Sequence, residues 1–456
     1  MKIGFTFDTG DVAELEVTGH RATMVNHEPD GTVAEELEFG TAVVPLGGGG
    51  EQRSSFRKRP RQAFRLEYLF DVDSTERRRW SNFLFGAQDR LVALPLLHEG
   101  IETSADAAIG ATLISVPSTA SIDFRIGGHV VVFSDADTFD VAAVQSISPS
   151  QVTLATPTVN AYAAGATIAP VRFARIDGVV TSARPPMGVV RVSVRYEVLE
   201  NDVGAPDGDL SGLPTLGTRV IFDRRNVMPR GDLNEAWAKN VTVIDNGSGI
   251  VRTLSDWDRN QHGFQLGFSS VSRAELWQTR ELLYALRGRF SSFWVPTMQQ
   301  EVVLVDGIAM NDDTLTVQGE GYLDFVRSRQ SKATLRVTAV DGTVVVRTVI
   351  SADVCDVDAG TEILTIDEPW PVTLELADVA RVEWLELVRF ASDLFQFDYS
   401  GRGRAKLQTS CVVVRDEPED NIPEDWGSVA EAPSDYDEWG AVADIVTSSS
   451  DWGGVG

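Results

Sequence analysis

Two stretches of the chain alternate apolar and polar residues, and each is followed at once by a helical pattern. The first stretch covers residues 63–70 (AFRLEYLF) and the second covers residues 263–268 (GFQLGF). A period of two is typical of a strand that has one face against a core. We therefore expect two half-buried strands. Their inward residues are Phe64, Leu66 and Tyr68 in the first, and Phe264, Leu266 and Phe268 in the second.

A helix is expected directly after each of these strands. Ser272 and Glu275 have the spacing of a capping box, in which side chains bond to free backbone N–H groups at a helix start. The earlier helix begins near residues 71–76 (DVDSTE). Apolar residues recur at intervals of three and four in both helices, which predicts one buried face each. These residues are Trp80, Phe83, Leu84 and Ala87 in the first helix, and Leu276, Leu283 and Leu286, with Thr279 between them, in the second. Residues 77–79 are arginines mostly off this face, and we expect them to face solvent or a partner.

The whole pattern repeats about 200 residues later along the chain. After each helix comes a short strand that ends at a proline, Pro95 or Pro296, because proline cannot donate to a β-ladder. Two further pairs of segments recur in the same order: 171–177 (VRFARID) with 388–393 (VRFASD), and 189–200 with 405–417. The shared order predicts an internal duplication. The alternative is two unrelated β-rich domains that share common patterns.

Each half carries an extra β-rich block between its proline and the later landmarks. In residues 101–169 five short strand signals are separated by turn residues, a spacing typical of a small barrel. The second block, residues 301–386, contains the pair Asp341-Gly342, a favoured hairpin turn. The predicted organisation is a first body (1–100 plus 170–200) with the insert 101–169, a linker (201–217), a second body (218–300 plus 387–416) with the insert 301–386, and a tail (417–456).

The fold class expected from these patterns is mainly β with few helices (β + α). Each body is predicted to be a β-sandwich or split barrel with one flanking helix and an inserted small β-barrel. A sheet with an apolar face needs a cover, and one crossing helix supplies it. Phe293 and Trp294 re-enter the sheet after the second helix, and we expect both in its core.

The composition supports folded domains and excludes some functions. Of the 456 residues, 43% are hydrophobic, which suffices for large cores, and the formal net charge is −27. This charge argues against binding nucleic acid through a basic face, although an acidic channel wall would let DNA pass without sticking. The two cysteines, Cys355 and Cys411, cannot form a disulfide framework, and we expect them to be small buried residues.

No targeting or membrane segment is evident in the sequence. Residues 1–10 (MKIGFTFDTG) lack the apolar centre of a signal peptide, and no apolar run approaches the roughly 20 residues that a spanning helix needs. The protein is therefore expected to be soluble, to be made in the cytoplasm and to have no membrane partner.

Motifs of catalysis and cofactor binding are absent from the sequence. The five histidines lack the spacing of metal ligands, and we expect them on the surface or in loops; they are His20, His27, His98, His129 and His262. Residues 47–50 (GGGG) are not followed by the lysine of a phosphate loop, and no Gly-x-Ser-x-Gly elbow occurs. We therefore expect no catalytic, cofactor-binding or metal-binding residues, and a protein that is not an enzyme. A hydrolase site assembled from distant acids is the interpretation that spacing cannot test.

One basic island stands out in this acidic chain. It lies within residues 53–65 and contains Arg57, Lys58, Arg59 and Arg61. A nucleic-acid patch is one interpretation, but the net charge of −27 favours contact with an acidic surface of a neighbouring subunit. The alternative is a mobile loop that balances local charge, since charge alone identifies no partner.

The C-terminal tail has a period of thirteen residues. Trp426, Trp439 and Trp452 each follow an acidic residue and each begin the motif Trp-Gly-x-Val. Acidic segments of this kind cannot bury enough surface to fold alone. Regular tryptophans nevertheless suggest anchors, which would dock on equivalent pockets of an oligomer or on a repeated partner. The alternative is that they dock on the protein's own body.

The two strand–helix–strand segments resemble the tail-tip proteins of long-tailed bacteriophages. These segments are FRLEYLFDVDSTERRRWSNFLFGAQDRLVALPL and FQLGFSSVSRAELWQTRELLYALRGRFSSFWVP. The resemblance, to distal tail and baseplate hub proteins, covers much of residues 40–200 and 215–416. It implies tube-like bodies that form a ring around a DNA channel, with inserts projecting outward and no catalytic residues.

What the resemblance implies about assembly is a structural virion protein at the tail tip. The expected partners are further copies of the chain, as a trimer with pseudo-sixfold symmetry or as a hexamer, together with the tail tube protein and the tape measure, hub and fibre proteins. DNA would pass without specific binding. The alternative function is a carbohydrate-binding or receptor-binding adhesin that uses the β inserts, and exposed aromatics such as Trp370 and Trp384 would favour it.

Overall fold

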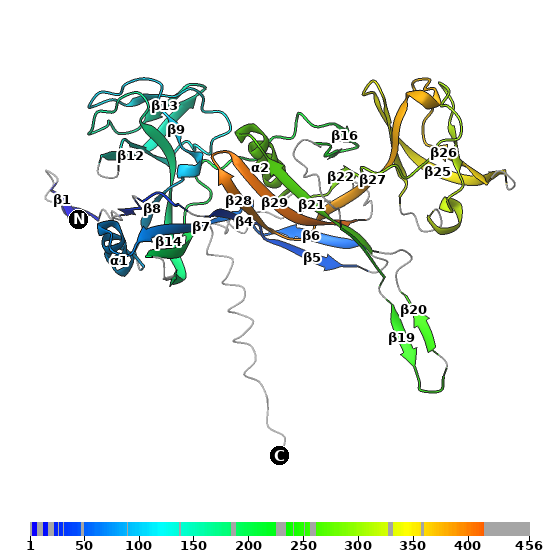
Figure 1. Ribbon diagram of the computed structural model, residues 1–456, viewed down its shortest axis with the longest axis horizontal. Coiled ribbons are helices and arrows are strands. Elements are labelled where there is room, and N and C mark those ends of the chain that lie inside the picture. The colour runs from blue at the N-terminus through cyan, green and yellow to red at the C-terminus, as the bar shows by residue number, and fades with distance from the viewer. Residues whose placement is uncertain are drawn as a thin grey trace, which may run out of the picture.

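The computed structural model describes the chain in fifteen segments. They are residues 2–6, 12–16, 22–25, 27–30, 32–46, 50–88, 90–135, 138–183, 188–224, 234–239, 241–249, 251–255, 261–326, 332–356 and 360–414. Over these residues the expected fold class is confirmed, because the chain is mainly β and its strands pair almost entirely antiparallel (Figure 1).

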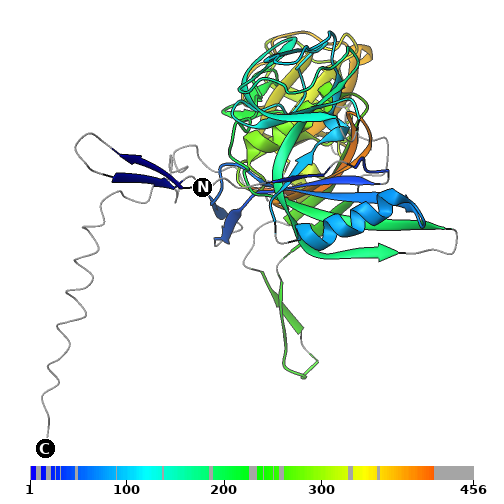
Figure 2. The same cartoon turned by 90° about the vertical axis from the view of Figure 1, so that its left-hand side faces the viewer.

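The first half is built on one sheet with a helix across it. Its elements are β1 (Lys2–Thr6), β2 (Val12–Glu16), β3 (Thr23–Met24), β4 (Val33–Glu38), β5 (Thr41–Pro45), β6 (Glu51–Ser55), β7 (Arg61–Asp71), α1 (Thr75–Ala87), β8 (Val92–Pro95), β14 (Thr167–Ala183) and β15 (Val189–Val198). The strands lie in the order β4-β7-β15-β14-β8, and β3 adds to β8 in parallel. Figure 2 shows α1 lying along this sheet.

The second half has the same order of strands. Its elements are β16 (Thr215–Leu216), β17 (Arg219–Val220), β18 (Glu235–Ala238), β19 (Thr242–Asp245), β20 (Val251–Leu254), β21 (Gln261–Ser270), α2 (Arg273–Leu286), β22 (Phe293–Pro296), β27 (Val379–Phe390), β28 (Leu394–Gly401) and β29 (Arg404–Val413). Its sheet runs β18-β21-β29-β27-β22. A parallel bridge from Ile221 to Trp294 stands where β3 meets β8 in the first half. The hairpins β5-β6 and β19-β20 also occupy corresponding places in the two halves.

Each insert adds a run of four strands in matching order, and the first insert has one short strand more. The first contains η2 (Leu97–Glu99), β9 (Ile101–Glu102), β10 (Leu113–Ser115), β11 (His129–Phe133), β12 (Phe139–Ser148) and β13 (Gln151–Leu154). The second contains β23 (Thr314–Gln318), the π-helical turn η3 (Tyr322–Val326), β24 (Thr334–Ala339), β25 (Val344–Asp356), β26 (Thr361–Ile366) and η5 (Leu376–Asp378). The orders are β10-β13-β12-β11-β14 and β23-β26-β25-β24-β27. Each insert has its own apolar core, and both project to the same side of the bodies (Figures 1 and 2).

The strand register corrects one detail of the sequence comparison. Pro95 lies opposite Val171, whereas Pro296 lies opposite Leu385. Val171 therefore corresponds to Leu385, and its expected counterpart, Val388, lies three residues further on, opposite Phe293. The identical letters Val-Arg-Phe at both sites misled the comparison, because backbone pairing and the buried face, not local identity, set the register of a strand.

The helix predictions are confirmed, and one core residue is more exposed than expected. The Ser272 hydroxyl accepts from the Glu275 N–H at 3.3 Å, while the Glu275 carboxylate accepts from the Val271 N–H at 2.8 Å. Phe293 is buried, but Trp294 is only partly buried, because its indole N–H reaches across the sheet edge to the carbonyl of Leu216 at 3.3 Å. Among the described residues, no helix is long and apolar enough to cross a membrane.

The two halves join through a strand pair and share one core. β28 of the second half pairs antiparallel with β4 of the first half, with Leu394 opposite Glu38 and Tyr399 opposite Val33. One apolar cluster contains Leu37 and Phe39 of the first half and Tyr284 and Phe395 of the second, along with both helices. The sheet therefore runs without interruption from one half into the other.

Candidate functional site

A buried group of charges lies where the two halves meet. Glu35 on β4 is completely buried, and Arg280 on α2 is 1% exposed. The Arg280 guanidinium forms an ion pair with the Glu35 carboxylate and donates a hydrogen bond to the Tyr399 hydroxyl at 2.7 Å. The Tyr399 hydroxyl in turn donates to Glu35 at 2.6 Å. Three elements, β4, α2 and β28, are thus held by one arginine.

The same arginine connects this group to the first insert. Arg280 lies 3.0 Å from a carboxylate oxygen of Glu99, which is on η2, and 3.6 Å from one of Asp123. Asp123 also pairs with Arg125 at 2.8 Å and with Arg172 at 2.7 Å. We call Glu35, Glu99, Asp123, Arg125, Arg172 and Arg280 the junction cluster. It contains three carboxylates and three guanidinium groups, so its formal charges balance.

The charged forms in the cluster stabilise one another. Burial alone would lower the pKa of Arg280, but Glu35, Tyr399, Glu99 and Asp123 outweigh it and raise that pKa well above the usual value. Burial would likewise raise the pKa of Asp123, but its neighbouring arginines hold it well below the usual range. Arg280 and Asp123 therefore remain charged, and removing either one leaves its partners buried without their counter-charge.

His98 borders the junction cluster and is only partly exposed, where the sequence suggested a surface or loop residue. Its ring packs 4.3 Å from the ring of Tyr399 and 5.8 Å from that of Phe64. Its Nε2 is buried and has no hydrogen-bond partner, and burial lowers the pKa of His98 to about 4. The local sequence could not show this, because β28, which covers the ring, comes from the other half of the chain.

A metal ion does not fit this cluster. Ligand atoms of Glu35, His98 and Glu99 lie within 4.8 Å of one another, which is close enough to share an ion. Arg280, however, pairs with both carboxylates. A cation would have to compete with a guanidinium that is already buried between them, and the balanced charges give it no net attraction. The arrangement is suited to holding the halves together.

No protein-family model matches this chain, and no curated protein matches it.

The predicted basic island is partly engaged within the chain. Arg57 lies 3.5 Å from the Glu38 carboxylate, and Arg59 lies 2.5 Å from the carboxylate of Asp207 in the segment between the halves. Lys58 and Arg61 are exposed. The island thus helps to fix the loop before β7, and its role toward a neighbouring subunit stays a prediction.

The structure describes the two tryptophans of the second insert but not the three tryptophans of the tail. Trp426, Trp439 and Trp452 lie outside the described residues. Trp370 is fully buried and Trp384 is 4% exposed, and both belong to the core of the second insert. These two tryptophans therefore provide no exposed platform for a sugar or receptor. Of the cysteines, Cys411 is buried as expected, and the side chain of Cys355 lies outside the described part of the structure.

The junction also relies on a close approach that admits only glycine. Gly288 follows α2 with a φ of +68°, and a Cβ there would lie 2.9 Å from the Cβ of Phe39 and 2.4 Å from a carboxylate oxygen of Asp393. Phe39 belongs to the first half and Asp393 to the second. The backbone of the second half thus passes directly against the core of the first.

This contact gives a prediction with an internal control. Gly288→Ala is expected to destabilise the protein by about 2 kcal/mol more than Gly110→Ala, because both residues have positive φ but a Cβ at Gly110 meets nothing within 4 Å. Thermal denaturation of the two variants measures the difference. Equal losses would show that the halves are not packed as tightly as the structure has them.

Proposed function

We propose that the protein is a structural ring component at the distal tip of a long phage tail, where it joins the tail tube to more distal tip or fibre proteins around the DNA channel. The observation that carries this proposal is the strand pairing of β4 with β28, through which two halves of identical strand order continue one sheet. Two similar bodies side by side are the repeating unit that a ring needs.

The presence of two similar bodies in each chain supports assembly into a closed ring. A body that pairs with the next body through different edges forms a head-to-tail interface, and copies related in this way close into a ring when the rotation allows it. Closure also removes exposed sheet edges, which otherwise invite aggregation. With two bodies in each chain, three chains would give pseudo-sixfold symmetry and would match a sixfold tube. Six chains would give two layers.

Charge and shape are consistent with this role. The net charge of −27 disfavours tight binding of DNA, so duplex could slide through a channel lined by this chain. Both inserts project to one side (Figure 1), where they would contact neighbouring tail proteins without narrowing the ring. The protein would act by assembly and not by catalysis. The adhesin alternative lacks support from Trp370 and Trp384, since both are buried.

The proposed function is tested by the mass and shape of the purified full chain. Native mass spectrometry and electron microscopy are expected to show a closed particle of three or six chains with a central channel wide enough for duplex DNA. A compact monomer at every concentration, or a monomer that hydrolyses glycans or esters, would overturn the proposal.

A further inference from the structure

We propose that the free edge of β14, residues 179–183, pairs antiparallel with β18 of a second copy of this chain, and that Trp237 of that copy fills the groove beneath α1. This inference names the contact surfaces of the ring proposed above and in that sense rests on it. The internal repeat supports it independently, because one such junction is already present between the two halves.

The end of β14 corresponds to β28, the strand that makes the internal junction. β28 pairs with β29, with Phe397 opposite Leu407, and β14 pairs with β15, with Ser182 opposite Val192. Leu407 and Val192 occupy the same place, because Leu407 pairs with Phe268 of β21 and Val192 with Tyr68 of β7. Ser182 therefore corresponds to Phe397.

β18 corresponds to β4, the other member of the internal junction. Glu235 lies opposite Phe264, and Glu35 lies opposite Phe64. Each strand pairs with the first long strand of its half and is followed by a hairpin, β5-β6 or β19-β20. Trp237 therefore corresponds to Leu37, the residue that packs into the shared core.

Both strands have an open edge in the described part of the chain. No described strand pairs with the far side of residues 179–183, or with β18 on the side away from β21. Val179 is 88% exposed and Trp237 is 62% exposed. In Figure 1, β14 lies in the left-hand part of the molecule, and the β19-β20 hairpin that follows β18 lies in the right-hand part. Open complementary edges in separate parts of the chain suit head-to-tail pairing of copies.

The internal junction also specifies the register between copies. Phe395 lies opposite Leu37 and Phe397 opposite Glu35. The corresponding pairs between chains are Val180 opposite Trp237 and Ser182 opposite Glu235. Thr181, between these two positions, would lie opposite Ala236, whereas Val179 and Val180 belong to the irregular stretch of β14 between Asp177 and Thr181.

The internal junction pairs a smaller side chain on β4 with a larger one on β28. The proposed junction pairs a larger side chain on β18 with a smaller one on β14. Inside the chain, Leu37 faces the large ring of Phe395. Between chains, the larger Trp237 would face the smaller Val180, and Ser182 replaces Phe397. The small residues leave a groove of about 350 Å³ between α1 and the sheet. Close packing favours a bulky partner for such a groove.

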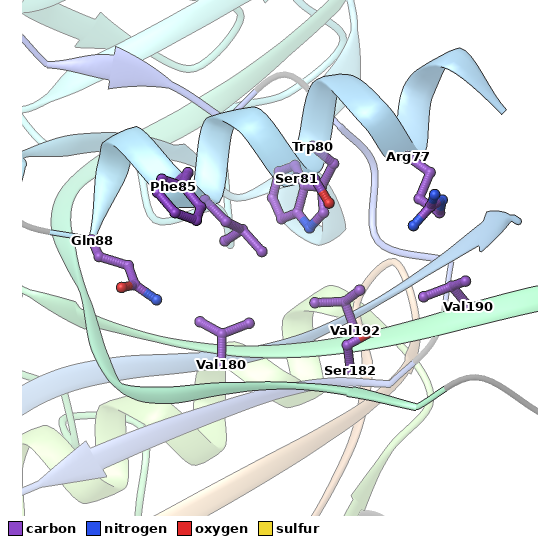
Figure 3. Close-up of a pocket in the computed structure, with 10 residues that line it drawn as sticks. Arg77, Trp80, Ser81, Phe85, Gln88, Val180, Ser182, Val190 and Val192 are labelled. Carbon is purple, nitrogen blue, oxygen red and sulfur yellow. The ribbon is translucent and has the colours of Figure 1, made fainter. Parts of the chain in front are cut away.

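Figure 3 shows the walls of this groove. Arg77, Trp80 and Phe85 come from α1, Gln88 follows the end of that helix, and the valines and Ser182 come from the sheet below. Phe85 is 97% exposed, an unusual position for a phenylalanine on a helix. The Nε of Arg77 is buried without a hydrogen-bond partner. Docking of β18 would cover the groove with Trp237 and bring the Glu235 carboxylate to the wall that carries Arg77.

Disulfide trapping between two single variants tests the interface. Residues directly opposite in an antiparallel pair have Cα atoms about 5 Å apart, which suits a disulfide. Full-length Thr181→Cys chains are mixed with full-length Ala236→Cys chains under glutathione disulfide, and covalent dimers are expected because these residues would lie opposite each other while Trp237 stays in place. Each variant alone controls for Cys355 and Cys411, and should give no dimers. A mixture of Ser182→Cys with Ala236→Cys shifts the register by one residue to the opposite face, and should also give none.

A second variant measures the contribution of Trp237 without cysteine chemistry. Trp237→Ala is expected to weaken assembly about 30-fold, as for an aromatic anchor at the centre of an interface. Phe325→Ala, which changes another exposed aromatic in the second insert, should leave assembly unchanged. Equal effects of the two changes would overturn the role given to Trp237.

The outcomes separate this inference from the proposed function. Closed particles that give no 181–236 dimers would overturn the interface and leave the ring standing. Dimers trapped in the matched register, from chains that form no channel-bearing particle, would support the interface and overturn the tail-tip role. Dimers of equal yield in the shifted register would contradict the pairing proposed here.

Discussion

Arg280→Met is expected to lower the free energy of unfolding at the junction by about 3–5 kcal/mol. Arg280 is 1% exposed and contacts Glu35, Glu99 and Asp123. Methionine keeps much of the length but removes the charge, so these carboxylates remain buried without their common partner. Hydrogen exchange of the β4 and β28 amides, followed by mass spectrometry, measures the loss where it occurs.

Two further variants test whether loss of the ion pair causes the destabilisation by Arg280→Met. One changes an exposed arginine, and the other is a double variant. Arg252→Met, at an exposed position on β20, should change stability by no more than about 0.5 kcal/mol. Glu35→Gln combined with Arg280→Met should cost less than the sum of the two single changes, because the double variant leaves no unpaired Glu35 charge. Additive losses would contradict the ion pair as the origin of the effect.

His98→Phe is expected to remove much of the acid sensitivity of the folded protein. The pKa of His98 is lowered from 6.5 to about 4 by burial. As the pH falls below 6.5, the unfolded chain binds a proton at this residue while the folded chain does not, so stability declines until the pH reaches about 4. This change in pKa corresponds to roughly 3 kcal/mol of the free energy of unfolding. That contribution is lost as the pH falls from 6.5 to about 4, and it is present above this interval. Phenylalanine cannot titrate but retains the packing against Tyr399.

Urea unfolding of both proteins at about pH 7 and about pH 4 makes this comparison. The wild-type protein should lose roughly 3 kcal/mol more than His98→Phe between the two conditions. A parallel decline in both proteins would assign acid sensitivity to other groups, and would place the His98 ring in contact with water.

Much of the fold could be predicted because its signals are local. The alternation through Phe64 and Phe264 marks the first long strand of each half, and the spacing of Ser272 and Glu275 marks the start of α2. These features depend on neighbours a few residues away, so a period of two or a cap reveals them. The same locality explains why Val388 was wrongly matched to Val171. The two positions share a short identical motif, but the register of the sheet matches Val171 to Leu385.

The junction cluster could not be predicted because its partners are distant in sequence. Glu35 and Arg280 are 245 residues apart. One signal was present: Arg280 follows Leu276 by four residues and precedes Leu283 by three, so an arginine lies on the apolar face of a helix. Such a residue requires a buried partner. Which of the many acids provides it depends on β4 lying beside β28, and that is a property of the fold.

The two bodies of the chain have the same strand order, and we propose that their internal junction is repeated between copies. A cryo-electron microscopy map of the assembled particle, at a resolution that separates strands, would show this junction. We expect a closed ring in which β18 of one chain lies beside β14 of the next as β4 lies beside β28, with Trp237 beneath α1. A particle whose chains meet through other surfaces, or whose two halves do not lie at equivalent positions around the axis, would contradict it.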